Sequence, residues 1–146
     1  MQDKNARADE TLRFRMVTHA VSVQSHDVGD VAGHSISLAR FSGLAFFPTT
    51  RSPRPISPPR LITGMAQAHL HFIQFTLEDG SVLWLKSVGT GTIDGTKTQF
   101  VGTVTVLGGK GRFDGVGGDG TVTGTRYTAL SVGVDLVSDY TVRIEK

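Results

Sequence analysis

Two histidines separated by a single residue carry the clearest chemical potential in this sequence. His69 and His71 stand in the stretch AHLHF, and residues two apart on a β-strand point to the same face. Two imidazoles on one face could bind a metal ion if a neighbouring strand supplied a third ligand, or one could act as a general base. A structural or exposed pair explains the spacing equally well. Because two ligands are too few, we predict no metal site and keep both histidines as candidate catalytic residues.

A second group of polar residues lies in SHDVGDVAGHS, residues 25–35. A histidine beside an aspartate, as in His26 and Asp27, could form an oriented base at the mouth of a pocket. Aspartates also favour turns, because their side chains bond to the nearby backbone, which explains Asp27 and Asp30 without any function. We keep His26 as a candidate substrate contact.

Charge is distributed unevenly along the chain. No carboxylate lies between Asp30 and Glu78, yet that stretch contains the arginines Arg40, Arg51, Arg54 and Arg60. If the segment folds over a pocket, these side chains could attract a carboxylate, an enolate or a tetronate-like anion. A solvated basic loop is the alternative. Arg40 is the third candidate catalytic residue.

Large apolar side chains could line such a pocket. The candidates for substrate contact are Phe72, Phe75, Trp84 and Tyr140. Residues of this kind are also ordinary constituents of a protein core, and the sequence leaves both interpretations open.

Several other chemistries are excluded or disfavoured. The chain has no cysteine, so it has no disulfide, thiolate nucleophile or cysteine-ligated metal. GVGGDG (115–120) matches a dinucleotide-binding pattern, but TVTGTRYTALSVGV follows it where a helix should begin, and that helix is what receives the pyrophosphate. We therefore predict no cofactor. The net charge is only +2, without a basic cluster interleaved with aromatics, so we predict no nucleic-acid partner.

Alternation of apolar and polar residues dominates the rest of the sequence. In VGVDLVSDYTVRI (132–144) most apolar residues fall on one face with a period of two, which indicates a strand. Further strands are predicted at 13–24, 35–47, 61–77 (bent or broken), 81–94, 98–107 and 119–129, with a hairpin turn at Glu78–Gly80. We predict an all-β fold, a single antiparallel eight-stranded β-barrel over residues 13–146, after a short flexible N-terminal arm at 1–12.

All five prolines lie in PTTRSPRPISPPR, residues 48–60. Proline cannot donate a hydrogen bond to a sheet, so this segment is predicted to be a loop at one end of the barrel. A loop of this length is either a binding loop or a disordered insertion.

The glycine-rich stretch VTVLGGKGRFDGVGGDGTVTG resembles the G-G-x-G-x-F-x-G signature of the allene oxide cyclase-like and dirigent-like β-barrel superfamily, with Gly108, Gly109, Gly111, Phe113 and Gly115 in its positions. FTLEDGSVLWLKSVG (75–89) is similar to the hairpin that precedes that signature. The resemblance implies a lipocalin-like barrel with an apolar cavity, assembled as a homodimer or homotrimer. The chain departs from the plant cyclases in lacking their cysteine and their first-strand glutamate, near which Ser22 and Gln24 stand here.

The resemblance implies a cofactor-free cyclase or isomerase that binds a small hydrophobic molecule, such as a polyene, polyketide or fatty-acid-like substrate, and steers its ring closure. The alternatives are a non-catalytic ligand-binding or structural barrel, and a module that binds partners or carbohydrate through its open end. MQDKNARADETLRFRM lacks the apolar core of a signal peptide, and no apolar run is long enough to cross a bilayer. We therefore predict a cytoplasmic protein that does not associate with membranes.

Overall fold

The computed structural model describes residues 9–48 and 65–146. These residues form seven strands and one short 3-10 helix. The elements are β1 (Glu10–Asp27), β2 (Ser35–Phe46), β3 (Met65–Thr76), β4 (Val82–Asp94), β5 (Lys97–Lys110), η1 (Gly111–Phe113), β6 (Gly117–Arg126) and β7 (Asp135–Glu145). Every neighbouring pair of strands is antiparallel, which confirms the predicted all-β class.

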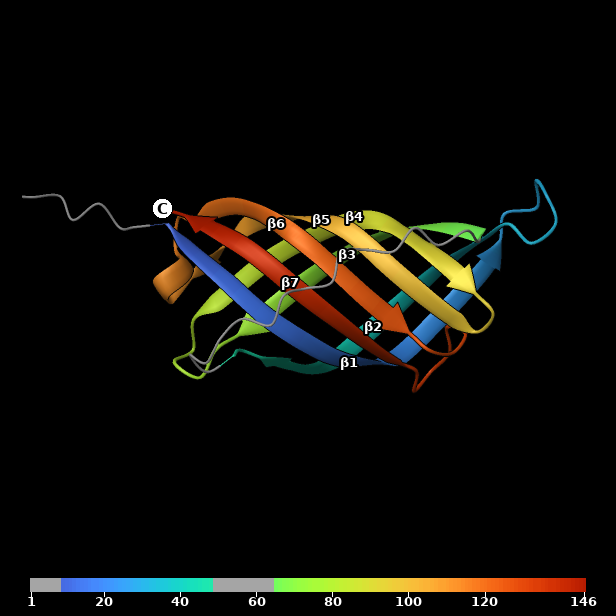
Figure 1. Cartoon of the computed structure of the whole chain (residues 1–146), viewed down its shortest axis with the longest axis horizontal. Coiled ribbons are helices and arrows are strands. Elements are labelled where there is room, and N and C mark those ends of the chain that lie inside the picture. Colours follow the sequence, from blue (N-terminus) through green and yellow to red (C-terminus); the bar gives the residue numbers. More distant parts are fainter. Residues whose placement is uncertain (1–8, 49–64) are drawn as a thin grey trace, which may run out of the picture.

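The strands form one sheet in the order β2-β1-β7-β6-β5-β4-β3. From β3 to β7 each strand pairs with the next, and β1 then pairs with β7, so that Glu10 lies opposite Ile144. The sheet curls strongly, and β1, β7 and β6 cross in front of β3 and β4 (Figure 1). The result is an incomplete barrel with a concave inner face.

The prediction of a closed, eight-stranded barrel is wrong for the part of the chain that the structure describes. Seven strands are present, and no ladder joins the edge strands β2 and β3. The sequence also predicted a bend or break within 61–77. Residues 65–76, MAQAHLHFIQFT, contain neither glycine nor proline, so nothing interrupts their extended backbone and β3 is continuous. Residues 61–64 lie outside the described part.

The hydrophobic core lies on the concave face of the sheet. It is formed by buried residues of β1, β4, β5, β6 and β7 together with the turn after β5. Its members are Phe14, Leu83, Leu85, Val104, Val106, Phe113, Val116, Val122, Tyr140, Val142 and Ile144. The alternation predicted in the last strand places Tyr140, Val142 and Ile144 inside. Val132 was expected in that strand, but β7 begins at Asp135, after Gly133 turns the chain with a φ of +85°.

The glycine-rich stretch forms a corner between β5 and β6, as predicted. Gly111 has a φ of +66°, a conformation that side chains with a Cβ rarely adopt. The next residue, Arg112, donates its backbone N–H to the hydroxyl of Ser81 at 3.1 Å. This turn brings Phe113 back over the core, where it is 1% exposed.

Two further expectations concern the chain outside the barrel. β1 begins at Glu10, three residues before the predicted start of the barrel at residue 13. Of the proline-rich loop 48–60, only Pro48 lies within the described residues, so Arg51, Arg54 and Arg60 lie outside them. Among the residues described, no helix has the length and apolar character needed to span a membrane.

Candidate functional site

The described residues line two cavities on the concave face, one toward each end of the strands. The first, which we call the apolar cavity, has a volume of about 220 Å³ and is lined by Glu10, Leu12, Phe14, Phe47, Phe75, Leu77, Leu83, Arg112 and Phe113. The second, which we call the polar cavity, has a volume of about 160 Å³. It is lined by Ser37, Leu38, Ala39, Phe41, Gln67, His69, Leu70, His71, Phe100, Arg126, Leu130 and Leu136.

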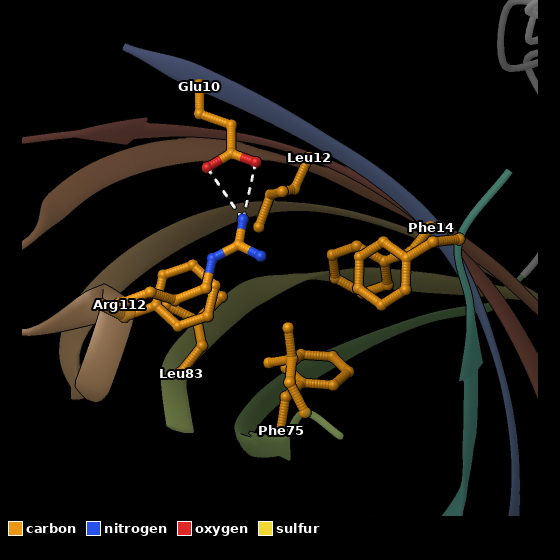
Figure 2. Close-up of a pocket in the computed structure, with 9 residues that line it drawn as sticks. Glu10, Leu12, Phe14, Phe75, Leu83 and Arg112 are labelled. Atoms are coloured by element: carbon orange, nitrogen blue, oxygen red, sulfur yellow. Dashed lines mark hydrogen bonds and ion pairs between the residues drawn. The ribbon is translucent and has the colours of Figure 1, made fainter. Parts of the chain in front are cut away.

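Aromatic rings form the walls of the apolar cavity. The ring of Phe14 lies 4.9 Å from that of Phe75, edge to face, and 5.0 Å from that of Tyr140, stacked on it. Figure 2 shows the rings of Phe14 and Phe75 near each other, with Arg112 and Glu10 at a distance from them. At the other end the guanidinium of Arg112 binds the carboxylate of Glu10 at 2.8 Å. Both ends of that ion pair are exposed to solvent, so it contributes little stability.

The polar cavity lies at the seam between the two edge strands. β2 contributes Phe41 and β3 contributes His69 and His71, although no ladder joins these strands in the described residues. The two imidazole rings are stacked with their centroids 4.7 Å apart, so the structure brings the sequence pair together on the inner face. In the described chain, no group of three or more histidine, aspartate or glutamate side chains is arranged to hold a metal ion.

Glycines make room for the histidines. His69 lies opposite Gly89 in the ladder, and Gly89 lies opposite Gly102. A Cβ at Gly102 would lie 3.3 Å from Nε2 of His69 and 2.7 Å from the carbonyl oxygen of Val88. The absence of side chains at these two inward positions allows the imidazole to lie against the sheet.

Burial keeps both histidines neutral. Desolvation lowers the pKa of His69, and desolvation together with the nearby His69 lowers the pKa of His71 to about 4. The Nδ1 atom of His69 is buried and has no hydrogen-bond partner among the described residues. A neutral imidazole with an unpaired nitrogen can accept a proton or a hydrogen bond from a bound molecule.

Arg126 supplies the positive charge of the polar cavity and was not among the residues predicted from the sequence. This last residue of β6 is 7% exposed. It donates from Nε to the carbonyl oxygen of Thr128 at 3.0 Å and from Nη2 to the hydroxyl of Thr98 at 3.1 Å. Its guanidinium lies 5.5 Å from the ring of Phe100. The signal was in the alternation, because Arg126 has the same parity as the buried Val122 and so must point inward.

Arg126 has no carboxylate within ion-pair distance among the described residues. Of the residues outside the description, only Asp3 bears a carboxylate side chain. Burial lowers the pKa of Arg126 from its ordinary value, but an arginine remains cationic at neutral pH even so. The polar cavity therefore contains one positive charge and two neutral imidazoles.

Two buried hydroxyls lie between the cavities. Ser87 is opposite His71 in the ladder, and its Oγ has no hydrogen-bond partner within bonding geometry in the described chain. Burial raises the pKa of Tyr140 to about 12, an effect that the nearby Ser87 hydroxyl partly offsets. Tyr140 therefore keeps its proton at neutral pH and can only donate or accept a hydrogen bond.

The structure does not bring the other sequence candidates into either cavity. Arg40 is exposed on β2 opposite Ser22, and Phe72 is 70% exposed on β3. Both have even numbers on strands whose odd-numbered residues face inward. Trp84 lies on the outer face, where its indole donates to Gln74 at 3.0 Å. His26 is exposed near the end of β1.

The histidine and aspartates of residues 25–35 form a surface turn. Nδ1 of His34 lies 2.7 Å from the Asp30 carboxylate, which also accepts the backbone N–H of Val31 at 2.8 Å. These two contacts lower the pKa of Asp30. The pair is exposed to solvent, and neither residue lines either cavity.

No family model, curated protein or solved structure matches this chain in the comparisons with known proteins.

Proposed function

We propose that this protein binds a small, mainly apolar molecule on the concave face of its sheet. The observation that carries the proposal is the apolar cavity of about 220 Å³, which the aromatic side chains of the described residues leave unfilled. Protein cores normally close such space, because voids cost packing energy. The volume is below the roughly 300–1,000 Å³ of pockets for drug-sized ligands, so the ligand is small.

Binding can be measured with a neutral fluorescent probe such as N-phenyl-1-naphthylamine, whose emission rises in apolar surroundings. We expect saturable binding to the intact chain. The substitution Leu77→Trp should weaken binding, because Leu77 lines the apolar cavity and is half-buried. Thr76→Trp is the matched control, since Thr76 is the exposed neighbour on β3. A Kd weaker than about 1 mM, which corresponds to a binding free energy of only about 4 kcal/mol, would contradict the proposal.

A second candidate function is catalysis of a cyclisation or isomerisation in the same interior. The observation that favours it is that the half-buried, neutral His69 and the cationic Arg126 line the same cavity. An imidazole can remove a proton next to a carbonyl while a guanidinium stabilises the enolate that forms. The same imidazolium then returns the proton to another carbon, so that no cofactor or co-reactant is consumed.

Cyclohex-3-en-1-one is a suitable probe for this second candidate. Its isomerisation moves a proton from C2 to C4 and gives a conjugated enone with strong ultraviolet absorption. We expect the intact chain to accelerate the reaction and His69→Asn to remove the acceleration while leaving binding of the fluorescent probe in place. Binding without any acceleration would favour a ligand carrier.

Membership of the allene oxide cyclase-like or dirigent-like superfamily is part of the same proposal. What supports it is the glycine-rich corner with Phe113 over the core, next to an antiparallel hairpin. The proposal extends to a cytoplasmic homodimer or homotrimer. Its support is that both edge strands expose large apolar side chains, including Leu44 and Phe72.

A further inference from the structure

The polar cavity has a charge that nothing in the described chain neutralises. Arg126 is 7% exposed and has no ion-pair partner among the described residues. Buried arginines are ordinarily paired with a carboxylate or another anion, because an unpaired charge in a low-dielectric site is unfavourable. A bound anion is the partner that this arrangement lacks.

The guanidinium still has donors to offer. Only two of its five N–H groups have partners in the described residues, the carbonyl of Thr128 and the hydroxyl of Thr98. These two contacts, and the ring of Phe100 beneath it, fix the orientation of the guanidinium plane. The unpaired N–H groups are on Nη1 and Nη2, which form the fork that binds the two oxygens of a carboxylate.

The number of charges decides the class of anion. Among the described residues that line the polar cavity, Arg126 is the one with a full charge at neutral pH, because the adjacent His69 and His71 are neutral. A monoanion is therefore neutralised completely. A phosphate dianion would retain one unpaired negative charge in a buried site. An unpaired charge of either sign is unfavourable in a low-dielectric site.

The remaining lining describes the rest of the ligand. The rest of the lining includes the apolar side chains of Phe41, Leu130 and Leu136, which favour a hydrocarbon chain. The volume of about 160 Å³ equals that of about five water molecules in the liquid. A short chain fits this space.

We propose that the polar cavity binds a small monocarboxylic acid, with its carboxylate on the Nη atoms of Arg126 and its hydrocarbon chain against Phe41, Leu130 and Leu136. Gln67 and His69 line the same cavity, where the amide N–H groups of Gln67 or a ring N–H of His69 can donate to the carboxylate. This inference rests on the proposed ligand-binding function and names the class of molecule that the site accepts.

Calorimetry on the full chain at neutral pH provides the test, with hexanoate and hexan-1-ol as probes. These two molecules have chains of equal length, and only the first is charged. We expect hexanoate to bind and Arg126→Gln to weaken it at least about tenfold, as expected for loss of a charge-assisted pair. Binding of hexan-1-ol should change less than about twofold in the same variant. Arg13→Gln is the matched control, because Arg13 is exposed on the outer face of β1.

Three results would overturn the assignment. The first is unchanged hexanoate affinity in Arg126→Gln, and the second is tighter binding of inorganic phosphate than of hexanoate. The third is binding of hexan-1-ol or the fluorescent probe without hexanoate, which would refute the acid site while ligand binding stands. If none of these molecules binds, the proposed function itself fails.

A measurement on the unaltered chain covers the case in which Arg126→Gln does not fold. The ¹⁵Nε signal of Arg126 should shift on titration with hexanoate and not with hexan-1-ol. Arg126→Lys keeps the charge but loses the fork, so its affinity for hexanoate should lie between those of the unaltered chain and the glutamine variant. A signal that does not respond to hexanoate would refute the proposal without any substitution.

Discussion

The pKa of His71 makes the stability of this protein depend on pH in the weakly acidic range. Its value in the fold is about 4, against an ordinary 6.5, so below pH 6.5 the unfolded chain binds a proton that the folded chain refuses. The contribution of neutral His71 to the free energy of unfolding is fully present above pH 6.5. It decreases as the pH drops toward 4 and changes no further below that. The groups that face His71 are His69 on β3, Ser87 on β4 and Arg126 on β6, and the described lining contains no carboxylate to reverse the sign.

We expect the free energy of unfolding to fall by up to about 2 kcal/mol between about pH 7 and pH 5, at about 1.4 kcal/mol per pH unit. Urea denaturation at the two pH values measures this loss. In His71→Asn the loss should be clearly smaller. His26→Asn, which replaces an exposed histidine, should behave like the unaltered chain. An equal loss in His71→Asn and the unaltered chain would show that other groups cause the pH dependence.

Sequence patterns identify some residues of the interior and miss others for one physical reason. The spacing of His69 and His71 was sufficient to predict a shared face, because it depends only on the period of a strand. Whether that face is inner or outer depends on the neighbouring strands. Phe72 and Trp84 were chosen for their size, but their parity puts them outside, whereas the same parity test puts Arg126 inside.

At the scale of the strands, the sequence predicted the positions of the strands well but not whether the sheet closes into a barrel. Strand bounds from the sequence agree with β2 and β4 within a few residues, because alternation and turn residues are local signals. The pairing of β1 with β7 joins residues more than a hundred positions apart and leaves no local trace. The number of strands that complete a barrel is set by such pairings, which explains why the predicted eight-stranded closure is wrong for the described chain.

The open edges of β2 and β3 predict self-association. Leu44 on β2 and Phe72 on β3 are 68% and 70% exposed, and both strands lack a ladder partner on one side in the described residues. An exposed edge with apolar side chains pairs readily with another chain, and lysine is an effective way to prevent this. We expect Leu44→Lys and Phe72→Lys to shift the protein toward monomer in sedimentation velocity experiments at increasing concentration.

Val101→Lys is the matched control for the edge variants. Val101 is also exposed on the outer face, at 42%, but it lies on the central strand β5, where both sides of the backbone are paired. Its substitution should leave the association unchanged. Equal effects of all three lysines would indicate association through the outer face in general, and a monomer at every concentration would contradict the proposed homo-oligomer.

For the whole molecule, a single core joins both ends of the sequence through the glycine-rich corner. Phe113 belongs to the same buried cluster as Phe14 on β1 and Ile144 on β7. Its ring therefore connects the turn after β5 with strands β1 and β7. A residue in this position stabilises the molecule as one cooperative unit, since small domains with one core unfold in a single transition.

Phe113→Ala should lower the free energy of unfolding by about 3–5 kcal/mol, the usual cost of removing a buried phenyl ring. The lost ring also lines the apolar cavity, so the space cannot be refilled without moving the corner that Gly111 sets. Leu107→Ala is the control, because Leu107 is 51% exposed on β5 and surface changes cost about 0.5 kcal/mol or less.

Urea unfolding followed by Trp84 fluorescence and by far-ultraviolet circular dichroism gives two independent midpoints. Cooperative unfolding requires that the two midpoints coincide in the unaltered chain and move together in Phe113→Ala. If the circular dichroism midpoint stays while the fluorescence midpoint falls, the corner unfolds separately from the sheet, and the apolar cavity is then closed by a locally stable turn rather than by the core as a whole.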